Sequence, residues 1–170
     1  MIRRAAPQDL DGVAELYNAV LRWESQGRVR TGWEGEGGPN RDTARAAGKA
    51  GTLYVCIQGG DVACAAVLIP GQPEGFAGVD WSESAKRGEV LTVQDLAVHP
   101  VLWRRGTGRS MMAFAEGLAA GKGRSVVRLS VCGENQAARA FFQSAGYRHA
   151  GTVGALAYYE KNLIPELEQG

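Results

Sequence analysis

Cysteine and histidine are scarce in this chain of 170 residues, which has three cysteines and two histidines. Protein zinc sites usually need four ligands of these kinds at close, regular spacing, and the chain contains no CxxC pair. We therefore expect no metal site. Each cysteine lies in an apolar run, which is typical of reduced, buried thiols: Cys56, Cys64 and Cys132.

Long hydrophobic runs and excess charge are lacking as well. The longest apolar segment, residues 62–69, is too short to cross a bilayer, which takes about 20 residues. The first ten residues are basic but are not followed by the apolar segment of a secretion signal. Nineteen basic residues face 18 acidic ones, whereas nucleic-acid-binding domains are normally far more basic. We expect a cytoplasmic protein that binds neither membranes nor nucleic acids.

Glycine is the residue type in excess, with 24 copies, and it separates regular from irregular stretches. The length fits one domain over residues 1–170. Glycines interrupt residues 24–40, and residues 70–87 form a second irregular stretch. The remaining segments show helical or strand periodicity. Their order, β-α-α-β-β-β-α-β-α-β-β, predicts an α/β fold in which helices cover both faces of a mixed sheet.

Four helices and seven strands are predicted from periodicity and from local signals. Asp9 is the expected N-cap of the first helix, and Asn40 and Gly51 bound the second. Gly59 and Gly60 form the two-residue turn of a hairpin. The predicted helices are residues 10–23, 41–50, 106–121 and 135–144, and the predicted strands are residues 2–5, 52–58, 61–69, 89–98, 126–131, 147–153 and 156–162.

Residues 93–112, VQDLAVHPVLWRRGTGRSMM, combine a strand, a turn and the start of a helix. A helix N-terminus carries unpaired N–H groups and about half a positive charge, so it attracts anions. Gly106 and Gly108 keep side chains away from a phosphate that approaches the backbone. The arginines that add positive charge there are Arg104, Arg105 and Arg109. The segment predicts a diphosphate-binding site, which we call the anion seat (residues 104–109).

Two common nucleotide-binding motifs do not fit the anion seat. A P-loop requires a lysine after its last glycine, where this chain has Arg109. A dinucleotide-binding fingerprint requires a third glycine at the position of Met111. Neither motif therefore explains the segment.

The run LAVHPxxxRxGxG, which begins at Leu96, resembles the acetyl-CoA-binding motif of the GNAT acetyltransferase superfamily. Further along, RLSV at residues 128–131 and NxxAxxFFxxxGY at residues 135–147 are similar to the next strand and helix of that family. YYEKN at residues 158–162 is similar to the last strand of many members. The resemblance is strong over residues 93–151 and covers nearly the whole chain by pattern.

The resemblance implies an N-acetyltransferase with acetyl-CoA as co-substrate. It implies a mixed, mostly antiparallel sheet of about six to seven strands that is splayed at the cofactor. The backbone of Leu96, Ala97 and Val98 would pair with the pantetheine arm. Asn135 would contact the pantetheine or thiol end, and the helix that contains Phe142 would flank the cofactor. The amides that hold the pyrophosphate would be those of Arg104, Arg105, Gly106, Thr107, Gly108 and Arg109. A homodimer is common in the superfamily.

Two positions depart from the family pattern. Trp103 stands where many members have Gln or Arg, although a seat made of backbone amides does not depend on that side chain. Phe142 stands where many members have a tyrosine that protonates the leaving thiolate. Tyr158 and Tyr159 are the alternative acids, and because side chains alternate along a strand, only one of them can face the site. Unassisted departure stays open, since a thiol has a pKa of about 8.5.

The acceptor amine must lose a proton before it attacks, because an alkylammonium has a pKa of about 10.4. Asp95 is the first candidate base and Glu89, expected earlier on the same strand, is the second. Pairing with an arginine would also explain a carboxylate there. We expect residues 24–38 and 70–88 to wall the site of a small-molecule or peptide amine. Carboxylates and aromatic rings suit a cationic amine, although these residues could also be solvated loop charges and packing tryptophans. The carboxylates are Glu24, Glu34, Glu36, Asp80 and Glu83, and the tryptophans are Trp33 and Trp81.

Two other functions stay open. A non-catalytic acyl-CoA-binding or sensing module would explain why Phe142 replaces the usual acid. It would bind acetyl-CoA and acetylate no amine. A different nucleotide-binding enzyme would be favoured if ATP or NAD, and not coenzyme A, stabilised the protein against heat.

Overall fold

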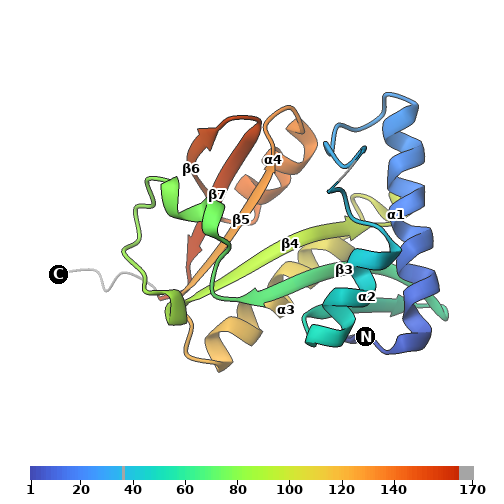
Figure 1. Ribbon diagram of the computed structural model, residues 1–170, viewed down its shortest axis with the longest axis horizontal. Helices are drawn as coiled ribbons and strands as arrows, with labels where there is room; N and C mark the ends of the chain where they lie inside the picture. The colour runs from blue at the N-terminus through green and yellow to red at the C-terminus, as the bar shows by residue number, and fades with distance from the viewer. Residues whose placement is uncertain (36, 165–170) are drawn as a thin grey trace. The chain divides into compact units, whose positions relative to one another are not determined.

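The computed structural model describes residues 1–35 and 37–164, which contain seven strands and four α-helices in the predicted order (Figure 1). The strands form a mixed, mostly antiparallel sheet in the order β1-β2-β3-β4-β5-β7-β6, as the resemblance implied. The strands are β1 (Ile2–Arg4), β2 (Leu53–Gln58), β3 (Asp61–Pro70), β4 (Val90–Val98), β5 (Val126–Cys132), β6 (Arg148–Val153) and β7 (Leu156–Asn162). The α-helices are α1 (Leu10–Ser25), α2 (Arg41–Ala50), α3 (Thr107–Gly121) and α4 (Gln136–Ser144).

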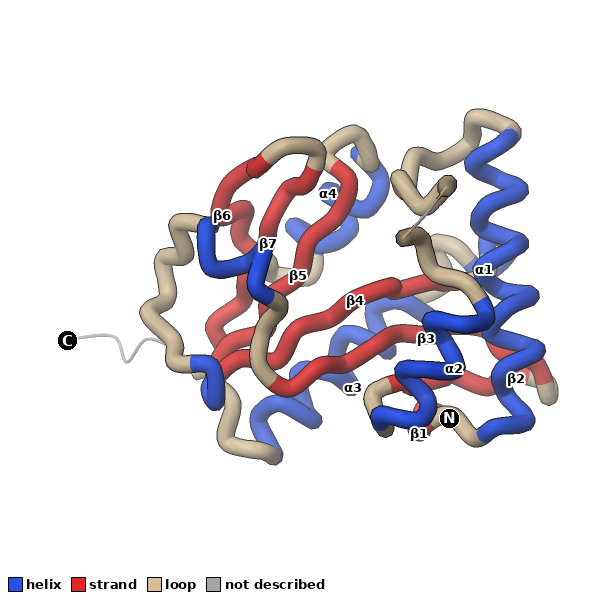
Figure 2. The backbone as a smooth tube through the Cα atoms, in the orientation of Figure 1, coloured by secondary structure: helices blue, strands red, loops and turns tan. Residues whose placement is uncertain are grey.

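The chain forms two compact units. The first consists of Met1–Leu68 and Val93–Phe114, and the second of Ile69–Thr92 and the described residues from Ala115 on. β4 and α3 supply residues to both units. The connection between β3 and β4 was predicted to be irregular, but it contains the short 3-10 helices η2 (Glu74–Gly78) and η3 (Arg87–Glu89), separated by loop (Figure 2).

In the first unit, α1 is amphipathic and buries one face. That face consists of Val13, Leu16, Tyr17, Ala19 and Val20. β1, β2 and β3 pair antiparallel, with Ile2 opposite Cys56 and Cys56 opposite Cys64. Gly59 and Gly60 join β2 to β3 with φ angles of 59° and 87°, which only glycine adopts readily. The predicted two-residue hairpin turn is therefore confirmed.

The ends of α2 are formed as predicted. The Asn40 side-chain oxygen accepts hydrogen bonds from the Asp42 and Thr43 N–H groups at 2.8 and 3.0 Å. Gly51 ends the helix in the left-handed conformation, with a φ of 73°. Both caps satisfy backbone groups that the helix leaves unpaired.

Asp9 occupies the N-cap position of α1, as predicted, but its side chain does not cap the helix. Its side chain makes no cap hydrogen bond to that helix. The carboxylate instead accepts from the Ala6 N–H at 2.7 Å and from the Arg3 guanidinium at 2.6 Å. The hydrogen bond from Arg3 holds the pKa of Asp9 below its usual value despite burial. Asp9 therefore fastens β1 to the 3-10 turn η1 (Pro7–Asp9), which precedes α1.

In the second unit, β5, β7 and β6 pair antiparallel. Tyr159 lies opposite Leu129 of β5 and opposite His149 of β6. The register of the β6–β7 pair shifts between His149 and Gly151, as at a β-bulge. Beside these strands, the connection that contains η2 contributes to a small apolar cluster. Its buried members are Phe76, Val79 and Tyr158, with Trp81 and Ala150 packed against them.

Candidate functional site

The turn between β4 and α3 has an irregular backbone at the anion seat. Arg104 has a φ of 65° and Gly106 a φ of 84°. Glycine adopts such angles freely, whereas they are uncommon for any other residue. α3 begins at Thr107, and the Ser110 N–H donates to the Gly106 carbonyl at 2.9 Å. The backbone N–H groups at the start of α3, which have no acceptor within the helix, therefore directly follow the connection from β4.

Most residues of the anion seat lie at the surface of the molecule. Arg104, Arg105 and Arg109 are exposed, as is Gly106. Thr107 is buried. This arrangement combines positive side chains with the positive end of a helix, which suits a phosphate-bearing ligand.

Trp103 ties the turn to the preceding strand, a role that the sequence did not reveal. Its indole N–H donates to the Val98 carbonyl at 2.7 Å. Its ring meets Trp23 of α1 edge-on, with ring centroids 4.9 Å apart. The Arg28 guanidinium lies 4.9 Å from the Trp23 ring centroid. The departure from the family pattern at Trp103 therefore has a structural role, and its only sequence signal was an aromatic residue at a usually polar position.

Asp95 lies where β4 departs from regular strand geometry. Its φ is 50°, an angle that is uncommon for residues with a Cβ. Its side chain is half-buried, and this burial raises the pKa of the carboxyl above its usual value. Ala97, two residues further along β4, is buried, and Leu96 and Val98 are half-buried. The strand thus carries a poorly solvated carboxylate next to the backbone that is predicted to meet pantetheine.

The second candidate base, Glu89, does not lie on β4. It is the last residue of η3, one position before the strand begins at Val90. Its carbonyl oxygen accepts a hydrogen bond from the Ser125 N–H at 2.9 Å. The strand starts one residue later than predicted because a 3-10 turn occupies residues 87–89.

The loop after α1 is organised by Glu24 and Trp33, two of the residues expected to wall the acceptor site. The Glu24 carboxylate accepts from the Gly32 N–H at 3.0 Å and from a neighbouring threonine hydroxyl. The Trp33 ring meets Tyr17 of α1 edge-on, with centroids 6.2 Å apart. Glu36, expected in the same wall, lies outside the described residues. Glu24 therefore has a structural role within the loop.

In the second unit, Asn135 and Phe142 occupy structural positions of α4. The Asn135 side-chain oxygen accepts from the Ala138 N–H at 3.1 Å, so this residue caps the helix. Phe142 is buried and cannot donate a proton. The aromatic rings that it contacts are those of Phe141, Tyr147 and Tyr159, at centroid distances of 5.0, 5.8 and 6.4 Å.

The two tyrosines of β7 that were candidate acids are both buried. The Tyr159 hydroxyl accepts a hydrogen bond from the Arg139 guanidinium at 2.9 Å. The Tyr158 ring meets Phe76 and Trp81 edge-on. Trp81, which was expected in the acceptor wall, donates its indole N–H to the Phe76 carbonyl at 2.8 Å. Trp81 is therefore a packing residue of the apolar cluster.

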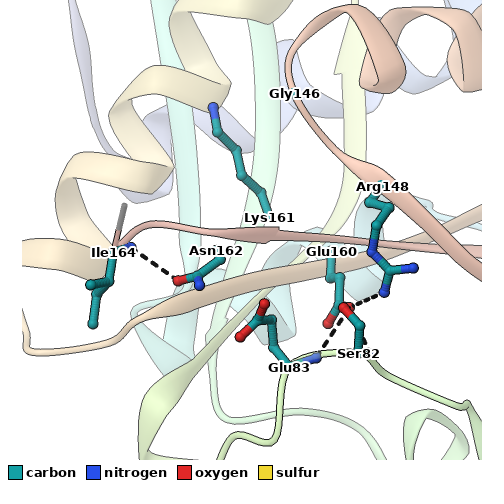
Figure 3. Close-up of a pocket in the computed structure, with 8 residues that line it drawn as sticks. All are labelled: Ser82, Glu83, Gly146, Arg148, Glu160, Lys161, Asn162 and Ile164. Carbon is teal, nitrogen blue, oxygen red and sulfur yellow. Dashed lines mark hydrogen bonds and ion pairs between the residues drawn. The ribbon is translucent and has the colours of Figure 1, made fainter. Parts of the chain in front are cut away.

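A pocket of about 330 Å³ in the second unit centres on a buried carboxylate (Figure 3). Glu160 is only 2% exposed, and its carboxylate accepts from the Ser82 N–H and hydroxyl and from the Arg148 guanidinium. Burial alone would raise the pKa of Glu160, but these bonds hold it below its usual value. The lining residues are Ser82, Glu83, Gly146, Arg148, Glu160, Lys161, Asn162 and Ile164.

Arg128 of β5 is the counter-charge of the Glu160 carboxylate. Its side chain is buried, and its Nε lies 3.6 Å from Glu160 Oε2. Burial lowers the pKa of Arg128, and the charge of Glu160 opposes this effect. The guanidinium donates to the Gln72 side chain at 2.8 Å and to the Glu83 carbonyl at 2.6 Å, and lies 4.4 Å from the centroid of the Trp81 ring. Sequence reasoning missed this network, which holds residues 72–83 in place.

Residues 1–35 and 37–164 contain no group of three or more His, Cys, Asp or Glu side chains arranged to hold a metal ion. All three cysteines are free thiols; Cys56 and Cys64 are buried, and Cys132 is half-buried. Within the same residues, no helix has the length and apolar character needed to cross a membrane.

The sequence matches the model of the Acetyltransferase (GNAT) family over residues 15–147, which is more than half of the chain. No curated protein matches the chain.

Solved structures share its fold. A GNAT-family acetyltransferase from Streptococcus agalactiae 2603 has a TM-score of 0.79 at 24% identity, over 95% of this chain and 94% of that chain. One from Listeria monocytogenes 4b F2365 has a TM-score of 0.78 at 15% identity over the same shares. PaiA N-acetyltransferase from Thermoplasma acidophilum, solved in complex with coenzyme A, has a TM-score of 0.73 at 15% identity, over 95% and 98%.

Proposed function

Because the chain belongs to the GNAT acetyltransferase family, we propose that it moves an acetyl group from acetyl-CoA to an amine of a small molecule or peptide, by direct attack in a ternary complex. The observation that carries this proposal is the anion seat. Its backbone is left-handed at the exposed residues Arg104 and Gly106 and leads into the N-terminus of α3. A helix N-terminus with arginines around it suits the diphosphate of coenzyme A.

The residues proposed to hold acetyl-CoA are those that the family pattern assigns to it. The backbone of Leu96, Ala97 and Val98 pairs with the pantetheine arm as an added strand would. The bond from Trp103 to the Val98 carbonyl supports this part, because it fixes the end of that strand. The pyrophosphate is assigned to the amides of Arg104, Arg105, Gly106, Thr107, Gly108 and Arg109. The family pattern assigns Asn135 to the pantetheine or thiol end and the helix of Phe142 to the cofactor's flank.

Acetyl transfer requires a neutral amine beside the thioester. The amine nitrogen attacks the carbonyl carbon, a C–N bond forms, and the C–S bond breaks as the thiolate leaves with the bonding electrons. The nitrogen loses its second proton as the amide forms, and the thiolate takes up one proton to become the free thiol of coenzyme A. Asp95 is proposed to accept the proton of the ammonium group, directly or through a water molecule. The raised pKa of Asp95 supports this role, because a base works best when its pKa lies near the working pH. Backbone N–H groups at 96–98 are proposed to stabilise the oxyanion.

The leaving thiolate needs a proton or must depart unassisted. Phe142 has no proton to give, so Tyr158 and Tyr159 remain the candidate acids. The Tyr159 hydroxyl accepts a hydrogen bond from the Arg139 guanidinium, so its own proton can be donated to another group. This contact supports Tyr159 over Tyr158, whose ring packs in the apolar cluster.

The variant Gly108→Glu tests the cofactor site. A carboxylate in the first turn of α3 would repel the phosphates, whereas the same charge suits the helix dipole and should leave the fold intact. Acetyl-CoA should raise the melting temperature (Tm) of the wild type and leave that of Gly108→Glu unchanged. The matched control is Gly117→Glu, a position in the same helix where an added Cβ meets nothing within 4 Å; it should respond like the wild type.

Normal binding of acetyl-CoA by Gly108→Glu would show that the anion seat is misplaced. An acceptor screen that detects the free thiol of coenzyme A over many amines separates the enzyme from its alternative. If acetyl-CoA stabilises the protein and no amine is acetylated, a non-catalytic acyl-CoA-binding module is the better description, which would also account for Phe142.

A further inference from the structure

The pocket of the second unit is lined by charges of both signs (Figure 3). The charged lining residues are Glu83, Arg148, Glu160 and Lys161. The Lys161 ammonium has its own partners beyond the pocket, because it donates to the Glu116 carboxylate and to the Ala145 carbonyl. One guanidinium and two carboxylates therefore remain to interact with a molecule in the cavity.

Arg148 has no carboxylate to itself. Glu160 Oε1 accepts a hydrogen bond from the Arg148 guanidinium, but Glu160 Oε2 lies 3.6 Å from Nε of the buried Arg128, so two cations share one carboxylate. The Arg148 side chain is 53% exposed. A guanidinium has five N–H donors, and the hydrogen bond to Glu160 uses one of them. Arg148 can therefore also bind the carboxylate of a ligand.

Glu83 presents the opposite charge on the same cavity. Its backbone is held in place, because its carbonyl oxygen accepts from Arg128 at 2.6 Å and its N–H donates to Glu160 at 3.4 Å. The residue is half-buried, and in Figure 3 no hydrogen bond or ion pair joins its carboxylate to another lining residue. This carboxylate can therefore accept hydrogen bonds from an ammonium group.

We propose that this pocket binds a small zwitterion, a free amino acid with an apolar side chain, whose carboxylate pairs with Arg148 and whose ammonium pairs with Glu83. The charges of Arg128, Arg148, Glu83 and Glu160 sum to zero. A ligand with one charge would leave a poorly solvated charge uncompensated, whereas a zwitterion keeps the balance. The volume of about 330 Å³ is at the lower end for small-molecule sites, which suits one amino acid. The exposed side chain of Ile164 also lines the pocket and offers an apolar contact.

This pocket is separate from the site proposed for the thiol end of coenzyme A. Glu160 and Asn162 pair with Arg128 and Val126 at the start of β5. Asn135, which the family pattern assigns to the thiol end, follows the other end of β5. Because β5 has seven residues, at about 3.3 Å per residue its two ends are roughly 20 Å apart. The zwitterion is therefore a second ligand, and its binding does not depend on the proposed acetyl transfer.

Calorimetric titration of the full chain with leucine and with methionine tests the proposal. Two further probes each lack one charge of leucine: 3-methylbutylamine has no carboxylate, and 4-methylpentanoate has no ammonium. At least one amino acid should bind, and both one-charge probes should bind at least tenfold more weakly. Glu83→Gln and Arg148→Gln should each raise the Kd for the amino acid about tenfold or more, because a hydrogen bond between charged groups is lost.

The matched controls are Glu74→Gln, an exposed carboxylate earlier in the same connection, and Arg45→Gln, an exposed guanidinium of α2. Both should keep the wild-type Kd. Binding of neither amino acid, equally tight binding of a one-charge probe, or an unchanged Kd in Glu83→Gln would each overturn the proposal. The shift in Tm with acetyl-CoA should be the same in Glu83→Gln and the wild type, so failure here is distinct from failure of the proposed function.

Discussion

Asp95 combines two features that each cost folding free energy. A left-handed backbone at a residue with a Cβ costs on the order of 1–3 kcal/mol, and the half-buried carboxylate gives up part of its hydration. Such features persist where the surrounding structure holds them in place, and they cluster at functional sites. The sequence predicted Asp95 as a candidate from its place in the motif. It could not predict the backbone angle or the burial, because both depend on residues far away in the chain.

We expect Asp95→Asn to be more stable than the wild type at pH 7. Because the pKa of Asp95 is raised on folding, the folded state holds this proton more tightly than the unfolded state does. Stability therefore falls as the pH rises from the unfolded pKa, about 3.9, through the raised folded pKa. The variant buries no charge, so its Tm should exceed that of the wild type at neutral pH, and the difference should shrink toward pH ~4.

The same variant should lose turnover, by about 100-fold if Asp95 is the base, and most at low pH, where the amine is most protonated. Scanning calorimetry and pH–rate profiles measure the two effects. Asp61→Asn, an exposed carboxylate beside the β2–β3 hairpin turn, is the control and should change neither. A pH–rate profile that matches that of the wild type would remove Asp95 from the mechanism.

At the scale of the element, local signals were sufficient for the strand, turn and helix of the anion seat. Residues 89–98 and 106–121 were predicted, and β4 (Val90–Val98) and α3 (Thr107–Gly121) are observed. Proline and glycine affect the backbone conformation of their immediate neighbourhood, so the ends of helices and strands near them can be predicted from the sequence. The way in which the turn is fastened could not be predicted, because Trp103 contacts Trp23, 80 positions earlier in the chain.

Trp103→Phe should weaken the binding of acetyl-CoA. The variant keeps an aromatic ring but loses the hydrogen bond to the Val98 carbonyl, so the turn is less well fixed before the ligand binds. The loss of about 1 kcal/mol corresponds to a roughly fivefold higher Kd, measured by calorimetric titration. Trp23→Phe, which keeps the indole–carbonyl bond, is the control. Equal affinities in Trp103→Phe and the wild type would show that the bond does not preorganise the turn.

At the scale of the whole molecule, the most deeply buried charged side chains stabilise the fold. Glu160 and Arg128 are each 2% exposed, on adjacent strands of the second unit. Removing one member of a buried pair leaves the other uncompensated. In the sequence, the two residues look like ordinary polar residues of a strand, because no neighbouring residue indicates that a charged side chain will be buried.

Glu160→Gln should lower the free energy of unfolding by about 3 kcal/mol at pH 7, because Arg128 would remain buried without its counter-charge. The wild type should lose this contribution as the pH falls through the depressed pKa of Glu160. Denaturant unfolding at several pH values measures both. The control, Glu116→Gln, breaks the more exposed pair with Lys161 and should cost less than about 1 kcal/mol. Similar losses in the two variants would contradict a special role for the buried network.

The sequence by itself determined the order of the elements, the hairpin turn at Gly59 and Gly60, and the strand, turn and helix around residues 104–109. These rest on periodicity, on glycine conformation and on helix ends, which are properties of neighbouring residues. Only the tertiary structure decided that the Asp9 side chain binds Arg3 instead of capping α1, and that Trp103 contacts Trp23. Such contacts join side chains that are adjacent only after folding, and burial, which sets their charge and pKa, has no local sequence signal.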